Sequence, residues 1–358
     1  MLKPERFVPW ALLLCAATLY LSLGQGTLYG DGPGILLMVN GGDAFGSRTH
    51  YLHGPMLLGL WSLMGPFGVS LHQAGVVLSC MGAAVGVSCV YYASRMLFGG
   101  WRRPALIAGI VATCPATMFY ATVVELHGPF LAFFGLVALA VANLALRPTM
   151  ANAILLGAAT GLAALAHASA HLLPVVALLL CPVLSSWRGP GIQVRRWLVL
   201  IGAQAVAHGL LVGITLGLVQ LLGLGGASVG SAADHVIGDA RASWHRLADS
   251  PTVLLHEWLL PFFPVSIACL AAIADVQARR MLGALLALVA VYVAPTAFLV
   301  SVGTEFGAYL LPLAWPAAVL AARVFSARWL VLFAVLGLCI GVPRIHAHDT
   351  VDDARRAS

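Results

Sequence analysis

Runs of about 20 consecutive apolar residues recur along almost the whole chain, and this recurrence limits the possible folds more than any other feature. A helix needs about 20 apolar residues to cross the hydrocarbon core of a bilayer. Of the 358 residues, 61% are hydrophobic and only 9% are charged, whereas a soluble domain carries roughly 25% charged residues. The sequence therefore predicts an all-α, polytopic transmembrane helix bundle and excludes a soluble fold.

The apolar runs predict about eleven spans in a single membrane domain, residues 1–342, with no room for an independent soluble domain. The predicted spans are 7–24, 72–94, 104–121, 127–146, 150–167, 170–186, 197–222, 252–274, 281–301, 306–322 and 328–342. Residues 25–71 form the first extracytoplasmic loop. The Gly- and Ser-containing segment 223–251 is predicted to be a mobile extracytoplasmic loop, and 343–358 a disordered tail.

The basic residues explain the net charge of +6 as a matter of topology. Lys3 and Arg6 precede the first apolar run. Further basic clusters recur once every two spans, at Arg95, Arg102, Arg103, Arg147, Arg188, Arg195, Arg196, Arg279, Arg280, Arg323 and Arg328. This positive-inside pattern predicts a cytoplasmic N-terminus. The expected location is a bacterial inner membrane, and no nucleic-acid partner is predicted.

Residues 51–70 of the first loop are apolar enough to enter the membrane. Counting them as a full crossing would place Arg95, Arg102 and Arg103 on the outer side. We therefore predict a membrane-surface or re-entrant helix here, lying with one face buried in the interface.

Ionisable side chains are costly inside a bilayer, so their positions point to function. The main candidates share the predicted outer side: Asp31, Asp43, His50, His53, Glu125, His127, His167, His171 and Glu305. Others lie in and beside the long loop 223–251. Each has a structural alternative: Asp31 and Asp43 as turn or cap residues, Glu125 as a helix cap, and the histidines as packed interface residues.

Recognisable nucleotide or metal motifs are missing from the sequence. His167 and His171 have the i, i+4 spacing that suits zinc on a helix, but no HExxH pattern or cysteine partner accompanies them. There is also no P-loop, GxSxG or dinucleotide fingerprint. A nucleotide-driven pump or an enzyme that uses a soluble cofactor is therefore not expected.

Several short motifs occur in a characteristic order. They are Gly30-Asp31, His50-Tyr51-Leu52-His53-Gly54-Pro55-Met56-Leu57, Val124-Glu125-Leu126-His127, Ala166-His167 followed by Leu172-Leu173-Pro174, and Glu305 with Tyr309-Leu310-Leu311-Pro312. Together they resemble the GT-C membrane glycosyltransferases, in the branch related to protein O-mannosyltransferases and the DUF2723 family. The chain departs from that pattern where Pro33 and Gly34 replace a second acidic residue.

The resemblance implies an inverting transfer of a sugar from a polyprenyl-phosphate donor to an acceptor on the extracytoplasmic side. The acceptor is a glycan, a lipid or a protein. Asp31 would be the general base, and His50, His53, Glu125, His127, His167 and Glu305 would bind substrate. The departing phosphate needs positive charge or a metal. The candidates are Arg48, Arg241, Arg246, a protonated His53 or His167, and a divalent cation (Mg²⁺ or Mn²⁺) on Asp31 and Glu125. Metal use stays open.

Two other classes of function remain. A transporter or flippase of a lipid-linked or small polar substrate can also use histidines and carboxylates, although no inverted repeat is visible. A non-catalytic GT-C-like scaffold subunit is the other, because the second acid is missing.

Overall fold

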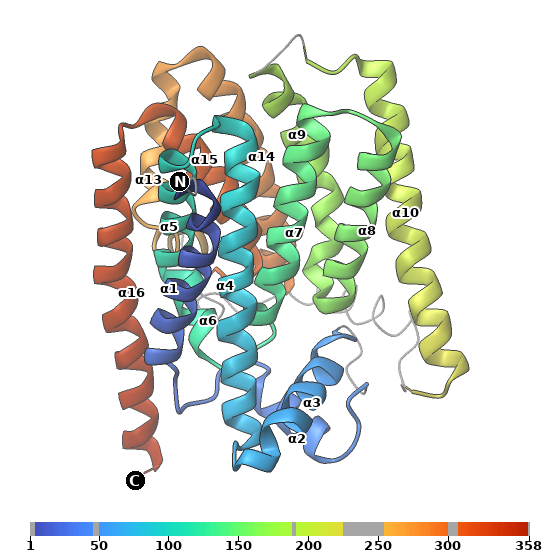
Figure 1. Ribbon diagram of the computed structural model, residues 1–358, viewed down its shortest axis with the longest axis vertical. Helices are drawn as coiled ribbons and strands as arrows, with labels where there is room; N and C mark the ends of the chain where they lie inside the picture. Colours follow the sequence, from blue (N-terminus) through green and yellow to red (C-terminus); the bar gives the residue numbers. More distant parts are fainter. Residues whose placement is uncertain (1–3, 46–49, 188–190, 225–253, 300–306, 357–358) are drawn as a thin grey trace.

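The computed structural model describes residues 4–45, 50–187, 191–224, 254–299 and 307–356, and within these ranges the chain is helical (Figure 1). Most helices run roughly along the long axis of the molecule, and the short helices α2 (Gly32–Asn40) and α3 (His53–Met64) lie at one end. The described residues form no strand beyond one isolated parallel bridge between Leu28 and Val124. The predicted all-α membrane bundle is confirmed.

Five described helices are long and apolar enough to cross a bilayer. The bounds of the helices that correspond to predicted spans are α1 Val8–Ser22, α4 Leu71–Phe98, α5 Arg102–Thr113, α6 Pro115–Thr122, α7 His127–Leu146, α8 Met150–Ala166, α9 Leu173–Ser186, α10 Val194–Leu221, α14 Val276–Leu299, α15 Ala314–Val324 and α16 Ala327–Arg356. α5 and α6 qualify as a sixth span if the bent pair is counted as one. The total of eleven stays a prediction.

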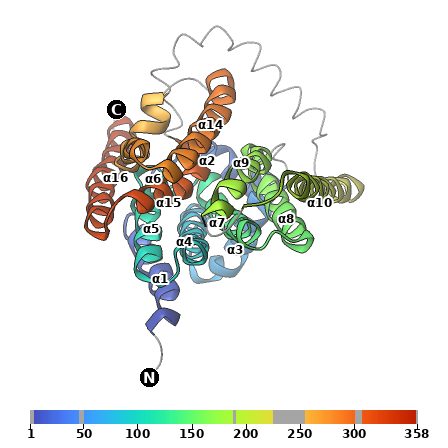
Figure 2. The ribbon, with the colours of Figure 1, turned by 90° about the horizontal axis from the view of Figure 1, so that it is seen from above.

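Helices α4 and α7 form the centre of the bundle (Figure 2), and small residues let them approach closely. A Cβ atom added to Gly86 on α4 would lie 2.4 Å from the carbonyl oxygen of Leu131 on α7, and one added to Gly82 would lie 2.6 Å from the Cα of Pro129. Close backbone contact through small residues is a common way for helices to associate in membranes. α4 begins at a capping box formed by Ser70 and Gln73.

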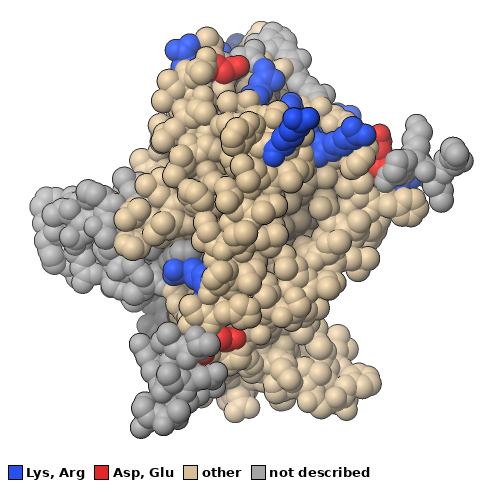
Figure 3. Space-filling model, turned by 90° about the vertical axis from the view of Figure 1, so that its left-hand side faces the viewer, with Lys and Arg blue, Asp and Glu red and all other residues tan. Residues whose placement is uncertain are grey.

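Basic residues gather at one end of the molecule, and a wide band below them on the same face carries few charges (Figure 3). Arg95, in the last turn of α4, makes a 2.8 Å ion pair with Glu5 near the start of the chain. Arg196 at the start of α10 donates to the carbonyl of Pro148. The first loop, α2 and α3 lie at the opposite end (Figure 1). The bundle thus has a basic end, which carries Arg95 and Arg196, and a far end, which carries α2 and α3.

The predicted span 104–121 is broken. Its halves, α5 and α6, meet at Cys114-Pro115 with a bend of 61°. The Ala116 N–H, which has no partner within its own helix, donates to the carbonyl oxygen of Pro261 at 3.1 Å, and the Cys114 thiol donates to the same oxygen at 3.2 Å. Pro261 belongs to the predicted span 252–274, which is itself irregular: a π-helical turn at Leu254–Leu259, then α13 (Val265–Ala268) and the 3₁₀ helix Cys269–Ala274.

Three expectations outside the spans have different outcomes. The apolar segment 51–70 contains α3, whose 12 residues reach only about 18 Å and are too short to cross a bilayer. The loop 223–251 lies mostly outside the described residues. The disordered tail predicted for 343–358 is wrong as far as Arg356, because these residues continue α16. Pro343 lies inside that helix. The residues after Pro343 are polar, so hydropathy alone did not predict that the helix continues.

Candidate functional site

The far end of the bundle brings together six of the seven predicted site residues. Asp31 precedes α2, and Glu125 lies between α6 and α7. His53 is the first residue of α3, and His50 lies three residues before it. The remaining two are His127, the first residue of α7, and His167, between α8 and the 3₁₀ helix Ala168–Leu172. Glu305, the seventh, lies outside the described residues.

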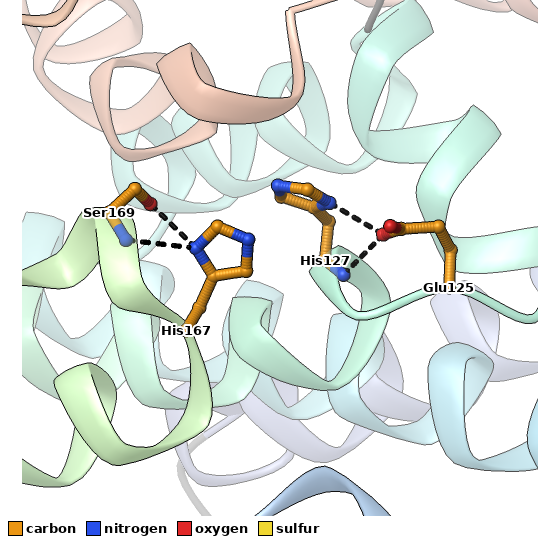
Figure 4. A network of polar contacts seen from close by, with 4 residues as sticks. All are labelled: Glu125, His127, His167 and Ser169. Atoms are coloured by element: carbon orange, nitrogen blue, oxygen red, sulfur yellow. Dashed lines mark hydrogen bonds and ion pairs between the residues drawn. The ribbon is translucent and has the colours of Figure 1, made fainter. Parts of the chain in front are cut away.

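Glu125 and His127 form a buried ion pair (Figure 4). One carboxylate oxygen, Oε2, accepts from the His127 backbone N–H at 2.7 Å and from His127 Nδ1 at 2.5 Å. Both residues are 2% exposed. Burial alone would raise the pKa of Glu125, but the charge and the two hydrogen bonds of His127, with a smaller contribution from His50, outweigh it and lower that pKa. Glu125 is therefore a carboxylate that favours the charged form of His127.

His167 faces this pair from the residue that follows α8 (Figure 4). Its Nδ1 accepts a hydrogen bond from the Ser169 backbone N–H at 3.2 Å and lies 2.7 Å from the Ser169 hydroxyl. Because Nδ1 is an acceptor, the ring proton must lie on Nε2. Burial, and then the charges of His127, His50 and His53, lower the pKa of His167 well below its ordinary value. His167 is thus a neutral donor, and its ring centroid is 4.2 Å from that of His127.

His50 and His53 complete a cluster of four histidines. The His50 ring lies 4.7 Å from the His167 ring, and the backbone holds it there through the bond from Leu52 N to Leu165 O. Burial is the main cause that lowers the pKa of His50 to about 3 and that of His53 to about 4, although Glu125 opposes the shift in both. His53 is 4% exposed, and its Nε2 has no hydrogen-bond partner among the described residues.

The loop that carries Asp31 packs directly against the Glu125 segment. Leu28 pairs with Val124 in the parallel bridge. A Cβ atom at Gly32 would lie 2.3 Å from the carbonyl oxygen of Val124, and one at Gly30 would lie 3.3 Å from Oε1 of Glu125. Gly30 also has a φ of +50°, which favours glycine. These two glycines therefore let the chain carry Asp31 to the edge of the buried cluster.

Asp31 is exposed and stands at the N-cap position of α2, but its side chain makes no capping hydrogen bond. The carboxylate is thus not used by the helix. Loss of hydration among the surrounding atoms, followed by the negative charge of Glu125, raises the pKa of Asp31, and His127 opposes part of that shift. Asp31 is consequently a stronger base than an ordinary aspartate.

Aromatic side chains surround the histidines, and the sequence reasoning gave them no role. The Tyr309 ring lies 5.6 Å from His127 and 5.8 Å from His167. Tyr120 lies 5.0 Å from His127, and Phe130 lies 5.2 Å from His167. Ser169, which contacts the His167 ring, was also not predicted from the sequence. Tyr309 was visible only as part of a weak motif.

Other candidates lie apart from the cluster or do not form a metal site. Asp43 is exposed. His171 pairs instead with His208, at 3.2 Å between ring nitrogens. Arg48, Arg241 and Arg246 lie outside the described residues. Within the described part of the chain, no three His, Cys, Asp or Glu residues are placed to hold a metal ion, and Oε2 of Glu125 is already bonded twice. Oε1 of Glu125 takes part in neither of these bonds, and a divalent cation between Asp31 and Glu125 stays a prediction.

Comparison with known proteins gives matches by structure alone. No known family profile and no curated protein matches the sequence. The fold is similar to that of ArnT from Cupriavidus metallidurans bound to undecaprenyl phosphate, with a TM-score of 0.60 and 15% identity over 90% of this chain and 60% of ArnT. It is also similar to the oligosaccharyltransferase of Archaeoglobus fulgidus in complex with zinc and sulfate, with a TM-score of 0.50 and 16% identity over 93% of this chain and 53% of that enzyme.

Both of these proteins are members of the GT-C superfamily. The predicted GT-C arrangement of membrane helices is therefore confirmed as the fold of this chain. The chain spans about half to three fifths of the length of the two structures. The narrower assignment to the O-mannosyltransferase and DUF2723 branch stays a prediction.

Proposed function

We propose that this chain is an integral membrane glycosyltransferase that moves a sugar from a polyprenyl-phosphate donor to an acceptor hydroxyl, with inversion. The observation that carries the proposal is the placement of Asp31. In a GT-C fold, its uncapped carboxylate stands at the edge of a buried Glu125–His127–His167 cluster. A buried ionisable cluster beside an exposed carboxylate of raised pKa is typical of a reaction site rather than of helix packing.

Asp31 acts as the general base in this proposal. The acceptor oxygen attacks the anomeric carbon of the donor sugar, its proton passes to the Asp31 carboxylate, and the bond from that carbon to the phosphate oxygen breaks. The lipid phosphate leaves with the bonding electrons. General-base catalysis by a placed carboxylate contributes about 10²–10⁴-fold, and the raised pKa of Asp31 brings its basicity closer to neutral pH.

His127 is the residue suited to stabilise the charge on the leaving phosphate. Burial keeps His50, His53 and His167 neutral, whereas the Glu125 carboxylate supports an imidazolium at His127. The neutral rings supply hydrogen bonds: His167 from Nε2, and His53 through the Nε2 that has no partner among the described residues. Fixed donors of this kind stabilise charge that develops in a transition state.

The fold and its setting support the proposed partners. ArnT is bound to undecaprenyl phosphate in its crystal structure, which supports a polyprenyl-phosphate donor that reaches the site from the bilayer. The acceptor is a glycan, a lipid or a protein. Basic residues gather at the opposite end of the bundle, so the positive-inside rule favours a cytoplasmic N-terminus and a site on the extracytoplasmic side.

Transfer from radiolabelled undecaprenyl-phosphate sugars tests the proposal. The full chain, reconstituted in lipid nanodiscs, is incubated with each donor and with extracted cell-envelope glycans, lipids and proteins. We expect label to leave the undecaprenyl phosphate with wild type and with Asp43→Asn, but not with Asp31→Asn. Asp43 is the matched control because it is an exposed aspartate of the same loop. Equal transfer by both variants, or none by wild type with any donor, would contradict the proposal.

A further inference from the structure

The C-terminal turns of α16 reach the far end of the bundle and bond to the loop between α1 and α2. Thr27 is 2% exposed, and its hydroxyl donates to Oδ1 of Asp349 at 2.9 Å. The Thr27 backbone N–H donates to the same oxygen at 3.3 Å. One aspartate near the C-terminus therefore accepts two hydrogen bonds from a single buried residue 322 positions earlier in the chain.

His348 makes a second hydrogen bond between α16 and the loop, and the contacts of Gln25 show which atom donates. The Gln25 amide nitrogen donates to the Thr122 hydroxyl at 2.8 Å, so the amide oxygen Oε1 faces His348 and can only accept. His348 Nδ1 lies 2.7 Å from that oxygen and therefore carries a proton. Nδ1 also lies 3.0 Å from the Thr27 hydroxyl oxygen. The hydrogen bonds thus run without a break from α6 through the loop to α16.

Aromatic contacts close the same junction. The Tyr29 ring lies 4.9 Å from Phe119 on α6 and 5.4 Å from His348 on α16, with edge-to-face geometry in both cases. The Arg344 guanidinium stands over the Phe119 ring at 5.9 Å. The residue between these contacts, Tyr29, is two positions from Asp31.

We infer that His348 and Asp349 are positioning residues that fix the loop carrying Asp31 against Glu125. The backbone ties the loop to α6 through the bond from Gln25 N to Thr122 O at 2.7 Å and to the next segment through the bridge between Leu28 and Val124. No side-chain cap fixes the start of α2, so the position of the loop depends on these neighbours and on α16. α6 supports it on one side and the end of α16 on the other. We call the hydrogen-bonded group of Gln25, Thr27, His348 and Asp349 the interlock. Its expected effect on sugar transfer rests on the proposed function. Its effect on the loop is independent of any substrate.

Hydrogen exchange of the loop measures the interlock without an assay of transfer. We compare amide exchange in peptides covering residues 23–34 in nanodiscs for wild type, Thr27→Val and Thr27→Ser. Valine keeps the shape of threonine but removes the donor to Asp349, whereas serine keeps the hydroxyl. One lost hydrogen bond corresponds to about a fivefold change in a local equilibrium. We expect exchange at least fivefold faster in Thr27→Val and near wild type in Thr27→Ser. Equal exchange in all three overturns the inference.

An engineered disulfide tests the same contact by linking the loop to α16 covalently. Thr27→Cys with Asp349→Cys is expected to cross-link under mild oxidation and to restore slow exchange in the loop. The matched control is Thr27→Cys with Ala347→Cys, because residues two apart on a helix point to nearly opposite sides. The control should not cross-link. Cross-linking of the control pair to the same extent, or failure of the first pair to cross-link, contradicts the contact itself.

Kinetics connect the interlock to the proposed reaction. A positioning role predicts that Thr27→Val lowers kcat about fivefold with an unchanged KM for the lipid donor, and that Thr27→Ser restores kcat. An unchanged kcat together with faster exchange removes the positioning role and leaves only a structural contact. Absence of transfer in wild type overturns the proposed function instead, and the exchange data then decide the interlock alone.

Discussion

A single carboxylate oxygen of Glu125 accepts both the backbone N–H and the ring Nδ1–H of His127, at 2.7 and 2.5 Å. The two residues are neighbours in the sequence, separated only by Leu126, and both are buried. Neither can replace its partner with water, so the pair is held together by the high free-energy cost of a buried, uncompensated charge. That cost makes the pair testable in unfolding experiments.

We expect Glu125→Leu and His127→Leu each to destabilise the protein by about 3–5 kcal/mol, because each leaves one buried ionisable group without its partner. The double variant should lose less than the sum of the two. Reversible unfolding in mixed micelles measures these free energies. The surface pair Arg95 and Glu5 is the control, where Glu5→Gln should cost about 0–1 kcal/mol. Additive losses at Glu125 and His127 would contradict the coupling.

Asp31→Asn should have opposite effects on stability and on transfer. The raised pKa of Asp31 means that folding disfavours its charged form, so at neutral pH the ionised carboxylate lowers stability. Removing the charge should raise the melting temperature at pH 7 while transfer falls about 10²–10⁴-fold. The stabilisation should disappear in acid, where wild-type Asp31 is protonated as well. Thermal scans at pH 7 and below pH 4 check the sign, and a lower melting temperature at pH 7 would refute it.

Transfer should decrease in acid with a midpoint above the usual range for an aspartate. The base must be ionised to accept the proton, so activity is present above the raised pKa of Asp31 and is lost as the pH falls through it. His50, with a pKa of about 3, and His53, with a pKa of about 4, are neutral between pH 5 and 8. Rates of transfer should fall as the pH is lowered through the raised pKa of Asp31, and His50→Gln should not move the midpoint of that fall. A midpoint that shifts in His50→Gln would assign the ionisation elsewhere.

Gly32→Ala and Gly34→Ala form a matched pair two residues apart. The added methyl at Gly32 would meet the Val124 carbonyl oxygen at 2.3 Å, whereas at Gly34 it meets no atom within 4 Å. The first change must separate the Asp31 loop from the Glu125 segment, so we expect a loss of at least 2 kcal/mol and strongly reduced transfer. The second should be neutral or stabilising, because alanine favours a helix over glycine by about 1 kcal/mol. Unfolding and transfer assays on both variants decide this.

Much of the helical framework could be predicted because hydropathy is a local property. The predicted span 127–146 coincides with α7, and 150–167 differs from α8 by one residue. Hydropathy could not predict the tertiary contacts between segments that are distant in the sequence. The break at Cys114 is stabilised by Pro261, and α2 was not expected because 25–71 was predicted as a loop with one membrane-surface helix at 51–70.

The candidate site divides in the same way. Glu125 and His127 are two positions apart, so their pairing follows from local geometry. His50 and His167 meet only because Leu52 bonds to Leu165 across more than a hundred residues. The interlock could not be predicted, because the sequence predicted disorder for 343–358, which includes His348 and Asp349. A polar helix end becomes ordered when its side chains have partners, and those partners lie in the first loop.

The shared Pro261 carbonyl has a consequence for how the protein is made. Ala116 and Cys114 both donate to that oxygen, and Pro261 emerges from the ribosome 147 residues after Cys114. A backbone N–H or C=O group that has no hydrogen-bond partner in the hydrocarbon core of a bilayer carries a high free-energy cost. The bent helix pair must therefore remain near the interface, or beside another polar surface, until the later segment has been inserted. The membrane helices of this chain are thus not inserted as a series of completed hairpins, because one early helix is completed only when a segment 147 residues later has been inserted.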